Sequence, residues 1–209
     1  MQNARETILN KLKKAKENNN KQINNIDFSE NVYVKSDLDL ANEFKENLKN
    51  VDGQTFICKN FDELKSNIRK IFNQKKSDNV FCIDKNIQEI IEKADIPFLE
   101  NEKDFLNLNI GVTACDFLSA RTGSVIVSSK SGSGRRLNIY PNIHIIIANK
   151  NQLVEDLDKA IVKIKEKYNN NLPSLITNIT GPSRTADIEK TLILGAHGPK
   201  ELIVFILDF

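Results

Sequence analysis

The 209-residue chain has no tryptophan, one methionine, two histidines and three cysteines. Cys58, Cys82 and Cys115 are odd in number, far apart and outside any Cys-x-x-Cys pair, so they indicate neither a disulfide framework nor a metal knuckle. His144 and His197 are too few to favour a self-contained zinc site. We therefore expect small buried cysteines in a reducing compartment, and no metal ion bound by this chain.

Long apolar runs are missing as well. The longest, residues 145–148 and 202–207, suit buried strands and fall far short of a bilayer span. Residues 1–6 lack the apolar core of a secretory signal. A hydrophobic fraction of 40% with a net charge of only +2 excludes a disordered chain. We expect a soluble cytoplasmic protein without a membrane span.

The basic excess is confined to the N-terminus. Through Gln22 the chain has a net charge of +4, and the remainder has a net charge of −2, so no nucleic-acid partner is expected. Ile8, Leu12 and Ala15 recur on one face and predict a first helix. A second helix is expected over residues 38–48, after the capping candidates Ser36 and Asp37. We assign residues 1–50 to an N-terminal helical arm or subdomain.

Residues 51–209 read as one α/β domain, because short β-rich runs alternate with helical segments, which is typical of a mainly parallel sheet covered by helices. The strands at 124–128 and 144–148 are expected to face each other across a polar loop. The other expected strands are residues 55–58, 80–83, 96–99, 109–113, 174–180 and 201–208. The expected helices are residues 61–72, 86–94, 114–120, 152–168 and 187–194.

Glycine placement directs the search for a site to the second half of the chain, because seven of the eight glycines lie between Gly111 and Gly198. Residues 129–136 combine glycines, serines and three cations, which suits a carboxylate or phosphate. Leu137 stands where a dinucleotide fingerprint needs its third glycine, and no P-loop follows. A solvated hairpin tip is the alternative interpretation.

A second candidate segment, residues 181–189, is expected to connect a strand to the N-terminus of a helix, where backbone amides bind anions. Ser183 and Thr185 are capping candidates. Arg184 works against the helix dipole unless it faces an anion. That anion is either Asp187 or Glu189, or the carboxylate or phosphate of a ligand.

Two further turns offer chemistry. His197 lies in a turn flanked by glycines. It is either a general base or a hydrogen-bond donor to a bound anion, or it is a structural histidine bonded to the backbone. The 121–124 turn supplies two hydroxyls beside Gly123, and the Gly-x-Ser-x-Gly nucleophile elbow is absent from the chain. His144 begins an apolar strand, which favours a structural role.

Taken together these segments resemble the LUD-domain family, and within it the lactate utilization protein C group (LutC or YkgG type). The resemblance is strong from residue 111 to the C-terminus. It rests on Gly111-Val112-Thr113-Ala114-Cys115-Asp116, Arg121-Thr122-Gly123-Ser124, Arg135-Arg136-Leu137, Pro141-x-x-His144, Gln152-Leu153-Val154, Ile179-Thr180-Gly181-Pro182-Ser183-Arg184-Thr185-Ala186-Asp187-Ile188-Glu189 and Gly195-Ala196-His197-Gly198-Pro199.

The resemblance implies a three-layer α/β/α fold similar to sugar-phosphate isomerases and CoA transferases. It also implies one of three products that together oxidise L-lactate to pyruvate. The other two, LutA/LutB-like partners, carry the iron–sulfur clusters, and no cofactor is expected in this chain. The resemblance supplies no nucleophile, and it leaves open both catalysis by this chain alone and homo-oligomer formation. Many relatives carry an acidic residue where this chain has Arg121, which alters the expected charge preference for a ligand.

The leading hypothesis is a lactate utilization component that binds a small anion or a partner in the glycine-rich crevice. The alternatives are a stand-alone enzyme acting on a sugar phosphate or CoA ester, and a non-catalytic assembly or regulatory subunit that docks through the basic arm. His197 is the candidate catalytic residue. The candidate ligand-binding residues are Thr122, Gly123, Ser124, Arg135, Arg136, Gly181, Ser183, Arg184, Thr185 and Asp187.

Overall fold

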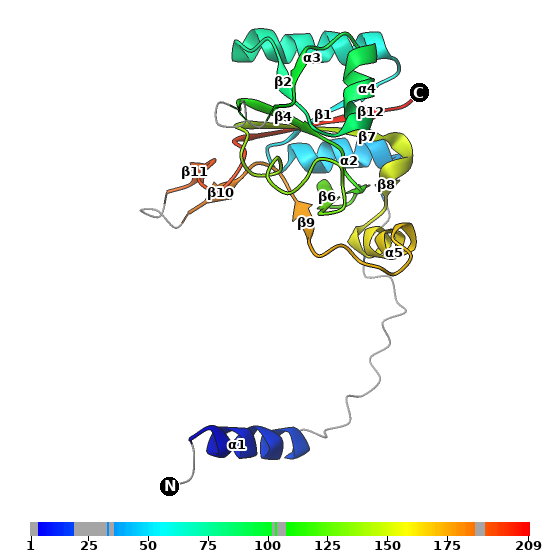
Figure 1. The fold of residues 1–209 in the computed structure, drawn as a ribbon. Helices are drawn as coiled ribbons and strands as arrows, with labels where there is room; N and C mark the ends of the chain where they lie inside the picture. Colours follow the sequence, from blue (N-terminus) through cyan, green and yellow to red (C-terminus); the bar gives the residue numbers. More distant parts are fainter. Residues whose placement is uncertain (1–3, 19–32, 34–35, 102, 104–107, 187–190) are drawn as a thin grey trace. The chain divides into compact units, whose positions relative to one another are not determined.

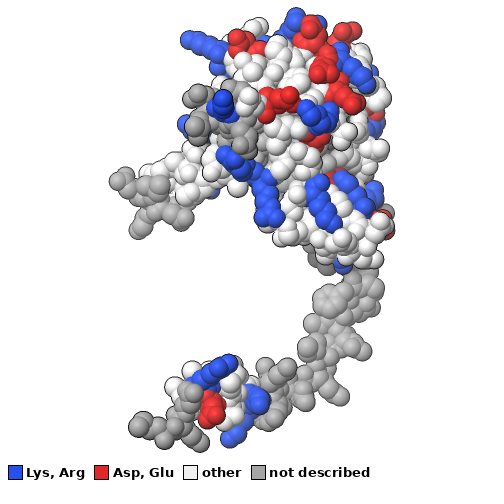
Figure 2. Space-filling model, viewed as in Figure 1, with Lys and Arg blue, Asp and Glu red and all other residues white. Residues whose placement is uncertain are grey.

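The computed structural model describes residues 4–18, 33, 36–101, 103, 108–186 and 191–209. The chain divides into two compact units, Met1–Lys35 and Ser36–Phe209. In the first unit, α1 (Ala4–Asn18) is the predicted N-terminal helix. Its Ile8 and Leu12 side chains are 59% and 61% exposed. Figure 2 shows several basic side chains on α1.

A six-stranded sheet forms the centre of the second unit (Figure 1). Every strand pairing in it is parallel. The α/β class and the mainly parallel sheet are therefore confirmed. In spatial order the strands are β1 (Gln54–Cys58), β12 (Glu201–Leu207), β7 (Ile143–Asn149), β4 (Ile110–Thr113), β2 (Val80–Phe81) and β3 (Phe98–Leu99).

The interior strand β12 contributes side chains to two cores, because successive side chains of a strand point to opposite faces. Ile203 and Phe205 pack on one face, with α3 (Phe61–Lys75) and α4 (Lys85–Lys93). Val204 and Ile206 pack on the other face, with α2 (Leu40–Lys49). Figure 1 shows α3 and α4 on one side of the sheet and α2 on the other. Both faces of the sheet are therefore buried, as the uninterrupted apolar run of β12 requires.

A second, four-stranded sheet lies on the same side of the main sheet as α2. Its inner face joins the core that contains α2, and its outer face packs against α5 (Leu157–Lys167). Lys167 Nζ and the Tyr168 hydroxyl both donate to Asp116 Oδ1, at 2.6 and 2.7 Å, and hold the end of α5 on this sheet. In spatial order the strands are β8 (Leu153–Val154), β5 (Phe117–Ser119), β6 (Ser124–Ser128) and β9 (Ile176–Ile179).

Helix α2 belongs to the second unit. Its N-cap is Asp39, which accepts from the amides of Ala41 and Asn42, rather than the predicted Ser36 or Asp37. Phe44 and Leu48 are fully buried, and burial of each side chain stabilises the fold by roughly 1.5–3 kcal/mol. The boundary expected between residues 50 and 51 thus differs from the division at Lys35 and Ser36, because α2 packs into the core of the α/β unit.

Two predicted helices are wrong in part. The segment expected as a helix over residues 114–120 contains β5, which pairs antiparallel with β6 and buries Leu118 in the inter-sheet core. The long helix expected over residues 152–168 begins only at Leu157, after the N-cap Asp156. The preceding Leu153 and Val154 form β8 beside β5. In both segments pairing with a distant strand prevails over local helical spacing.

The loop at residues 129–136 does not join two facing strands, because β6 and β7 lie in different sheets. Residues 187–190 of the helix expected over 187–194 lie outside the described residues. Ile193–Leu194 is strand β11, which pairs antiparallel with β10 (Arg184–Thr185).

The structure also bears on the cysteines and on the expected lack of a membrane span. Cys58, Cys82 and Cys115 are all free and buried, as predicted. Burial raises the pKa of the Cys82 thiol to about 12. Among the described helices, none combines the length and apolar character needed to cross a membrane.

Gly123, a candidate ligand residue, is needed for the close approach of α2. Its φ is +58°, and a Cβ at this position would overlap the backbone of Asn47 and Leu48. Gly134 has a similar φ of +67°, but the nearest atom to its Cβ position is Ile83 Cδ1 at 3.8 Å. Of these two glycines, Gly123 alone combines an unfavourable φ with a blocked Cβ position.

We expect Gly123→Ala to lower the free energy of unfolding by about 2–4 kcal/mol, since backbone strain and overpacking add. The matched Gly134→Ala variant carries only the backbone strain and should lose about 1 kcal/mol. Urea unfolding of both variants measures the difference. Equal losses would contradict the α2 contact as the cause.

Candidate functional site

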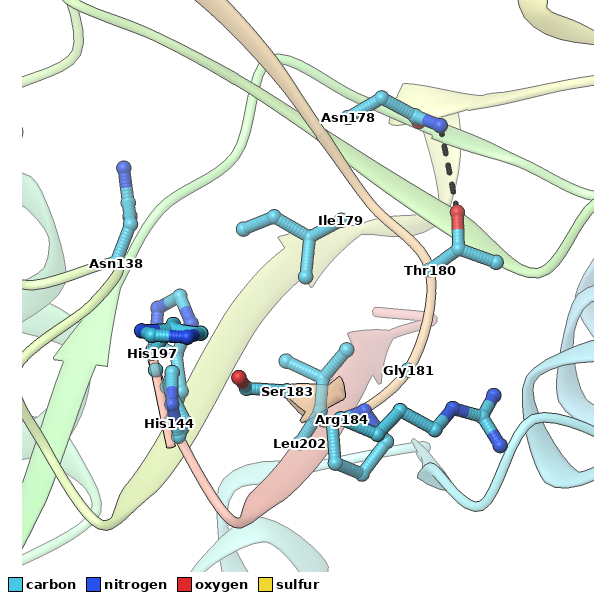
Figure 3. Close-up of a pocket in the computed structure, with 13 residues that line it drawn as sticks. Asn138, His144, Asn178, Ile179, Thr180, Gly181, Ser183, Arg184, His197 and Leu202 are labelled. Atoms are coloured by element: carbon cyan, nitrogen blue, oxygen red, sulfur yellow. Dashed lines mark hydrogen bonds between the residues drawn. The ribbon is translucent and has the colours of Figure 1, made fainter. Parts of the chain in front are cut away.

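A cavity of about 370 Å³ lies beside the amino ends of β7 and β12 (Figure 3). Its lining comes from residues 178–184, where β9 ends, from the turn at residues 197–199, and from Asn138, His144 and Leu202. Its position differs from the predicted crevice between a strand end and a helix N-terminus, because Arg184 and Thr185 form strand β10. The two most distinctive motifs of the second half nevertheless meet here.

Backbone hydrogen bonds connect the two turns of the cavity. The Ser183 amide donates to the Pro199 carbonyl at 2.8 Å, and the Ser183 carbonyl accepts from the Gly195 amide at 2.8 Å. A Cβ on Gly198 would lie 3.1 Å from Ser183 Cβ, so a larger residue there would push against Ser183. Figure 3 shows the Ser183 hydroxyl pointing toward His144 and His197.

His144 is the buried titratable group of the cavity. Its side chain is fully buried, and Nε2 lies 2.8 Å from the Thr113 hydroxyl on the neighbouring strand β4. Nδ1 is buried and has no hydrogen-bond partner among the described residues. Burial lowers the pKa of His144 from 6.5 to about 3, because the apolar strands disfavour the charged ring. The imidazole is therefore neutral at pH 7.

A second buried polar atom belongs to the same lining. Asn138 Oδ1 has no partner within the described part of the chain, and Asn138 lines the cavity with His144. Buried polar groups are normally hydrogen-bonded, so these two atoms are exceptions within the wall of the cavity. Neither residue was a predicted ligand-binding residue. The available signal was His144 itself, a polar ring within an otherwise apolar strand.

Arg184 has a partner that sequence reasoning missed. Its Nη1 lies 3.0 Å from Asp52 Oδ2, and its Nη2 donates to the Val51 carbonyl. Figure 3 shows the side chain extending away from the two histidines. The same turn requires Gly181, whose φ is +81° and whose Cβ position would overlap Val51. These residues attach the cavity wall to the α2–β1 connection.

The cationic loop contacts a different part of the protein. Arg135 Nη2 donates to Ser174 Oγ at 2.6 Å, and Lys130 Nζ donates to the Asn171 carbonyl. Arg135 and Arg136 line a separate cavity of about 110 Å³. Ser133 is buried and donates to Asp84 Oδ2 at 3.3 Å. The loop is thus anchored to the body of the domain, which differs from a solvated hairpin tip.

Of the remaining predicted site residues, some lie at the cavity and others lie away from it. Ser124 is buried behind the cavity wall, with its hydroxyl 2.7 Å from that of Thr180. Thr122 donates to Ser119 Oγ at 2.9 Å, away from the cavity lining. Thr185 lies in β10, Asp187 lies outside the described residues, and His197 is exposed at the cavity. The structure thus gathers Gly181, Ser183, Arg184 and His197 around one space.

The side chains of the cavity are mostly neutral hydrogen-bonding groups. Within the described ranges, no group of three or more His, Cys, Asp or Glu side chains could hold an ion. The side chains at the cavity offer hydroxyl, amide and imidazole groups, together with the paired Arg184. The lining therefore suits hydrogen-bonded recognition of a small polar molecule.

A family model described as the LUD domain matches residues 41–207. The chain belongs to the LUD-domain family. The matched range includes α2, in agreement with the packing of that helix into the α/β unit. The sequence resemblance to this family is confirmed.

Relatives of this LUD domain include Lactate utilization protein C of Bacillus subtilis (strain 168), 36% identical over 112 residues, which cover 52% of this chain and 47% of that protein. Lactate utilization protein C of Bacillus licheniformis is 34% identical over 111 residues, covering 52% of this chain and 46% of that protein. The chain thus spans about half the length of the curated relatives it matches.

A solved structure has a similar fold. The crystal structure of a DUF162 family protein from Deinococcus radiodurans aligns with a TM-score of 0.59, at 16% identity, over 80% of this chain and 96% of that chain. This similarity supports the α/β architecture of the LUD domain and concerns the fold alone.

The buried His144 predicts a pH dependence of stability. Between pH 6.5 and 5 the unfolded chain protonates this histidine while the folded domain keeps it neutral. The free energy of unfolding should therefore decrease as the pH falls, with a slope of up to about 1.4 kcal/mol per pH unit. Carboxyl groups whose pKa is lowered in the folded domain, such as those of Asp39 and Asp208, also stabilise the fold. Their stabilising contribution is lost mainly below pH 5, because their ordinary pKa is 3.8.

Urea unfolding at several pH values tests this expectation. His144→Gln should flatten the slope between pH 6.5 and 5 whatever its effect on the midpoint, while the exposed Asn142→Ala control should keep it. An unchanged slope in His144→Gln would show that another group titrates.

Proposed function

We propose that this LUD domain is a lactate utilization protein C-like component of a system that oxidises L-lactate to pyruvate, and that it binds a small carboxylate in the cavity. The observation that carries the proposal is the cavity formed where the 178–184 and 197–199 segments meet. Its volume of about 370 Å³ is at the lower end of ligand pockets, as a small substrate requires. The names of the relatives, Lactate utilization protein C, support the same assignment.

Two side chains are suited to hold the carboxylate. Ser183 and His197 come from the two hydrogen-bonded turns and border the same space. A serine hydroxyl and an imidazole N–H both donate to carboxylate oxygens, and His197 is also the candidate for proton transfer. Oxidation of lactate to pyruvate releases two protons and two electrons. We propose that the electrons pass to iron–sulfur partner proteins and that this chain supplies binding and orientation.

The distribution of cations favours a carboxylate over a sugar phosphate or CoA ester. Phosphate groups are commonly bound by several Arg, Lys or backbone donors. Arg135 and Arg136 line the separate cavity, and Arg184 is paired with Asp52. A small carboxylate needs only a few hydrogen-bond donors, such as those of Ser183 and His197.

We expect L-lactate-dependent dye reduction by the iron–sulfur lactate utilization proteins of the same organism to require this chain. Ser183→Ala should lower the rate at subsaturating lactate roughly 10- to 100-fold, since a hydrogen bond to a charged group contributes about 1.5–3 kcal/mol. The Asn142→Ala control, outside the cavity, should keep the rate. The same rate with and without the chain would overturn the proposed function.

A paired substitution tests the role of Arg184. If its guanidinium serves only the contact with Asp52, Arg184→Ala and Asp52→Ala should each lower the free energy of unfolding by at most about 1 kcal/mol, because the pair is partly exposed. Both variants should then lower the rate of dye reduction only slightly and by the same amount. A much larger loss in Arg184→Ala alone would assign the guanidinium to the ligand. Urea unfolding and initial rates provide the two measurements.

A further inference from the structure

Strand β1 forms one edge of the main sheet. In the described part of the chain it pairs with β12 alone. It has five residues, whereas the other edge strands among the described elements have two to four. Proteins usually protect an edge strand with proline, with charged residues or by making it short. The sequence of β1, Gln-Thr-Phe-Ile-Cys, contains neither proline nor charge.

A hydrogen bond at the end of β1 determines which of its backbone groups face outward. The Cys58 carbonyl accepts from the Asp208 amide at 2.9 Å, so the backbone of Cys58 is directed toward β12. The backbone groups of successive residues point to alternate sides of a strand. Phe56 is therefore also directed toward β12, and the N–H and C=O groups of Thr55 and Ile57 face outward. These outward groups have no hydrogen-bond partner among the described residues.

A second β1 strand matches this edge. When two β1 strands align antiparallel about a two-fold axis at Phe56, Thr55 of each copy lies opposite Ile57 of the other. Residues opposite each other in a hydrogen-bonded antiparallel pair exchange both N–H···O bonds, so every outward group of both strands gains a partner. The contact is closed, because each copy presents the same surface to the other. Phe56 and Ile57 are only partly buried, so the pairing also covers apolar surface.

The charges at the two ends of β1 favour the antiparallel alignment. Lys59 follows the strand with its side chain 62% exposed, and Asp52 precedes it with its side chain 68% exposed. Each has an ion-pair partner in its own chain, Asp208 and Arg184 respectively. Antiparallel strands bring the Lys59 end of one copy to the Asp52 end of the other, where opposite charges attract. Parallel strands would bring like charges together.

We propose that β1 is the self-association surface of this LUD domain, to which a second copy of the chain adds its own β1 in the antiparallel direction. The main sheet then continues across a two-fold axis. A five-residue pairing buries less than the roughly 800 Å² per partner of a standard interface, so the expected Kd is on the order of 10 μM. Strand β1 contributes no residue to the lining of the large cavity, so this association and the proposed function stand or fall separately.

Sedimentation velocity of the purified full chain measures the association. Between about 1 and 300 μM, a range that spans the expected Kd, the mass should rise from 23.7 kDa toward twice that value. A monomer throughout this range would overturn the proposal.

Thr55→Pro blocks the edge without removing a hydrogen bond to β12. Proline is tolerated in an edge strand where the replaced N–H faces away from the sheet. We expect the dimer Kd to rise at least about 10-fold, since each copy loses a donor to the other. Thr55→Val is the matched control and should keep the Kd, because it retains the amide and loses only a hydroxyl without a partner among the described residues. An unchanged Kd in Thr55→Pro, with circular dichroism showing a folded chain, would overturn the proposal.

Amide hydrogen exchange of the unsubstituted chain gives a measurement that does not depend on the folding of a variant. At about 1 μM, well below the expected Kd, the outward amides of Thr55 and Ile57 should exchange much faster than those of Phe56 and Cys58. At about 300 μM the exchange of Thr55 and Ile57 should slow several-fold, while that of Phe56 and Cys58 changes little. Dimer formation without slower exchange at Thr55 and Ile57 would assign the contact to another surface and overturn the proposal.

Discussion

Burial of β7 and β12 on both faces is the constraint on which the rest of the domain depends. These neighbouring strands pair along seven residues, from Glu201 with Ile143 to Leu207 with Asn149. Their apolar side chains supply both the core under α3 and α4 and the core shared with α2 and the second sheet. Because such a pair has no face left for water, every polar group placed in it needs a partner. His144 is the exception within β7, and it lies where the cavity begins.

The cavity exists because elements from both sheets meet the α2–β1 connection at one edge. The chain leaves the second sheet at β9, turns at Gly181 against the α2–β1 connection, and forms hydrogen bonds to the turn before β12. Gly123 lets the backbone of α2 approach the second sheet in a similar way. Several residues on which the sequence resemblance rests, such as Gly123 and Gly181, therefore serve the packing around the site, while Ser183 and His197 border the space itself.

The electrostatic character of the site follows from the same packing. Arg184 is directed to Asp52, and Lys130 and Arg135 of the 129–136 loop are directed to the connection between α5 and β9. The lining therefore has more neutral hydrogen-bonding groups than the cation-rich segments suggest. Neutral donors and acceptors discriminate between ligands by hydrogen-bond pattern, whereas free cations attract anions of many kinds.

The sequence by itself determined the α/β class, most of the strands and helices, the burial of the cysteines and the family, because these depend on local periodicity and on contiguous motifs. It also indicated that Gly181, Ser183 and His197 belong to unusual turns. Only the tertiary structure decided that residues 117–119 form a strand, that Asp52 faces Arg184, and that Asn138 joins His144 in one cavity. The pair of Arg184 with Asp52 and the pairing of β5 with β8 join segments far apart in the chain. All three features depend on the packing of the whole core rather than on local spacing.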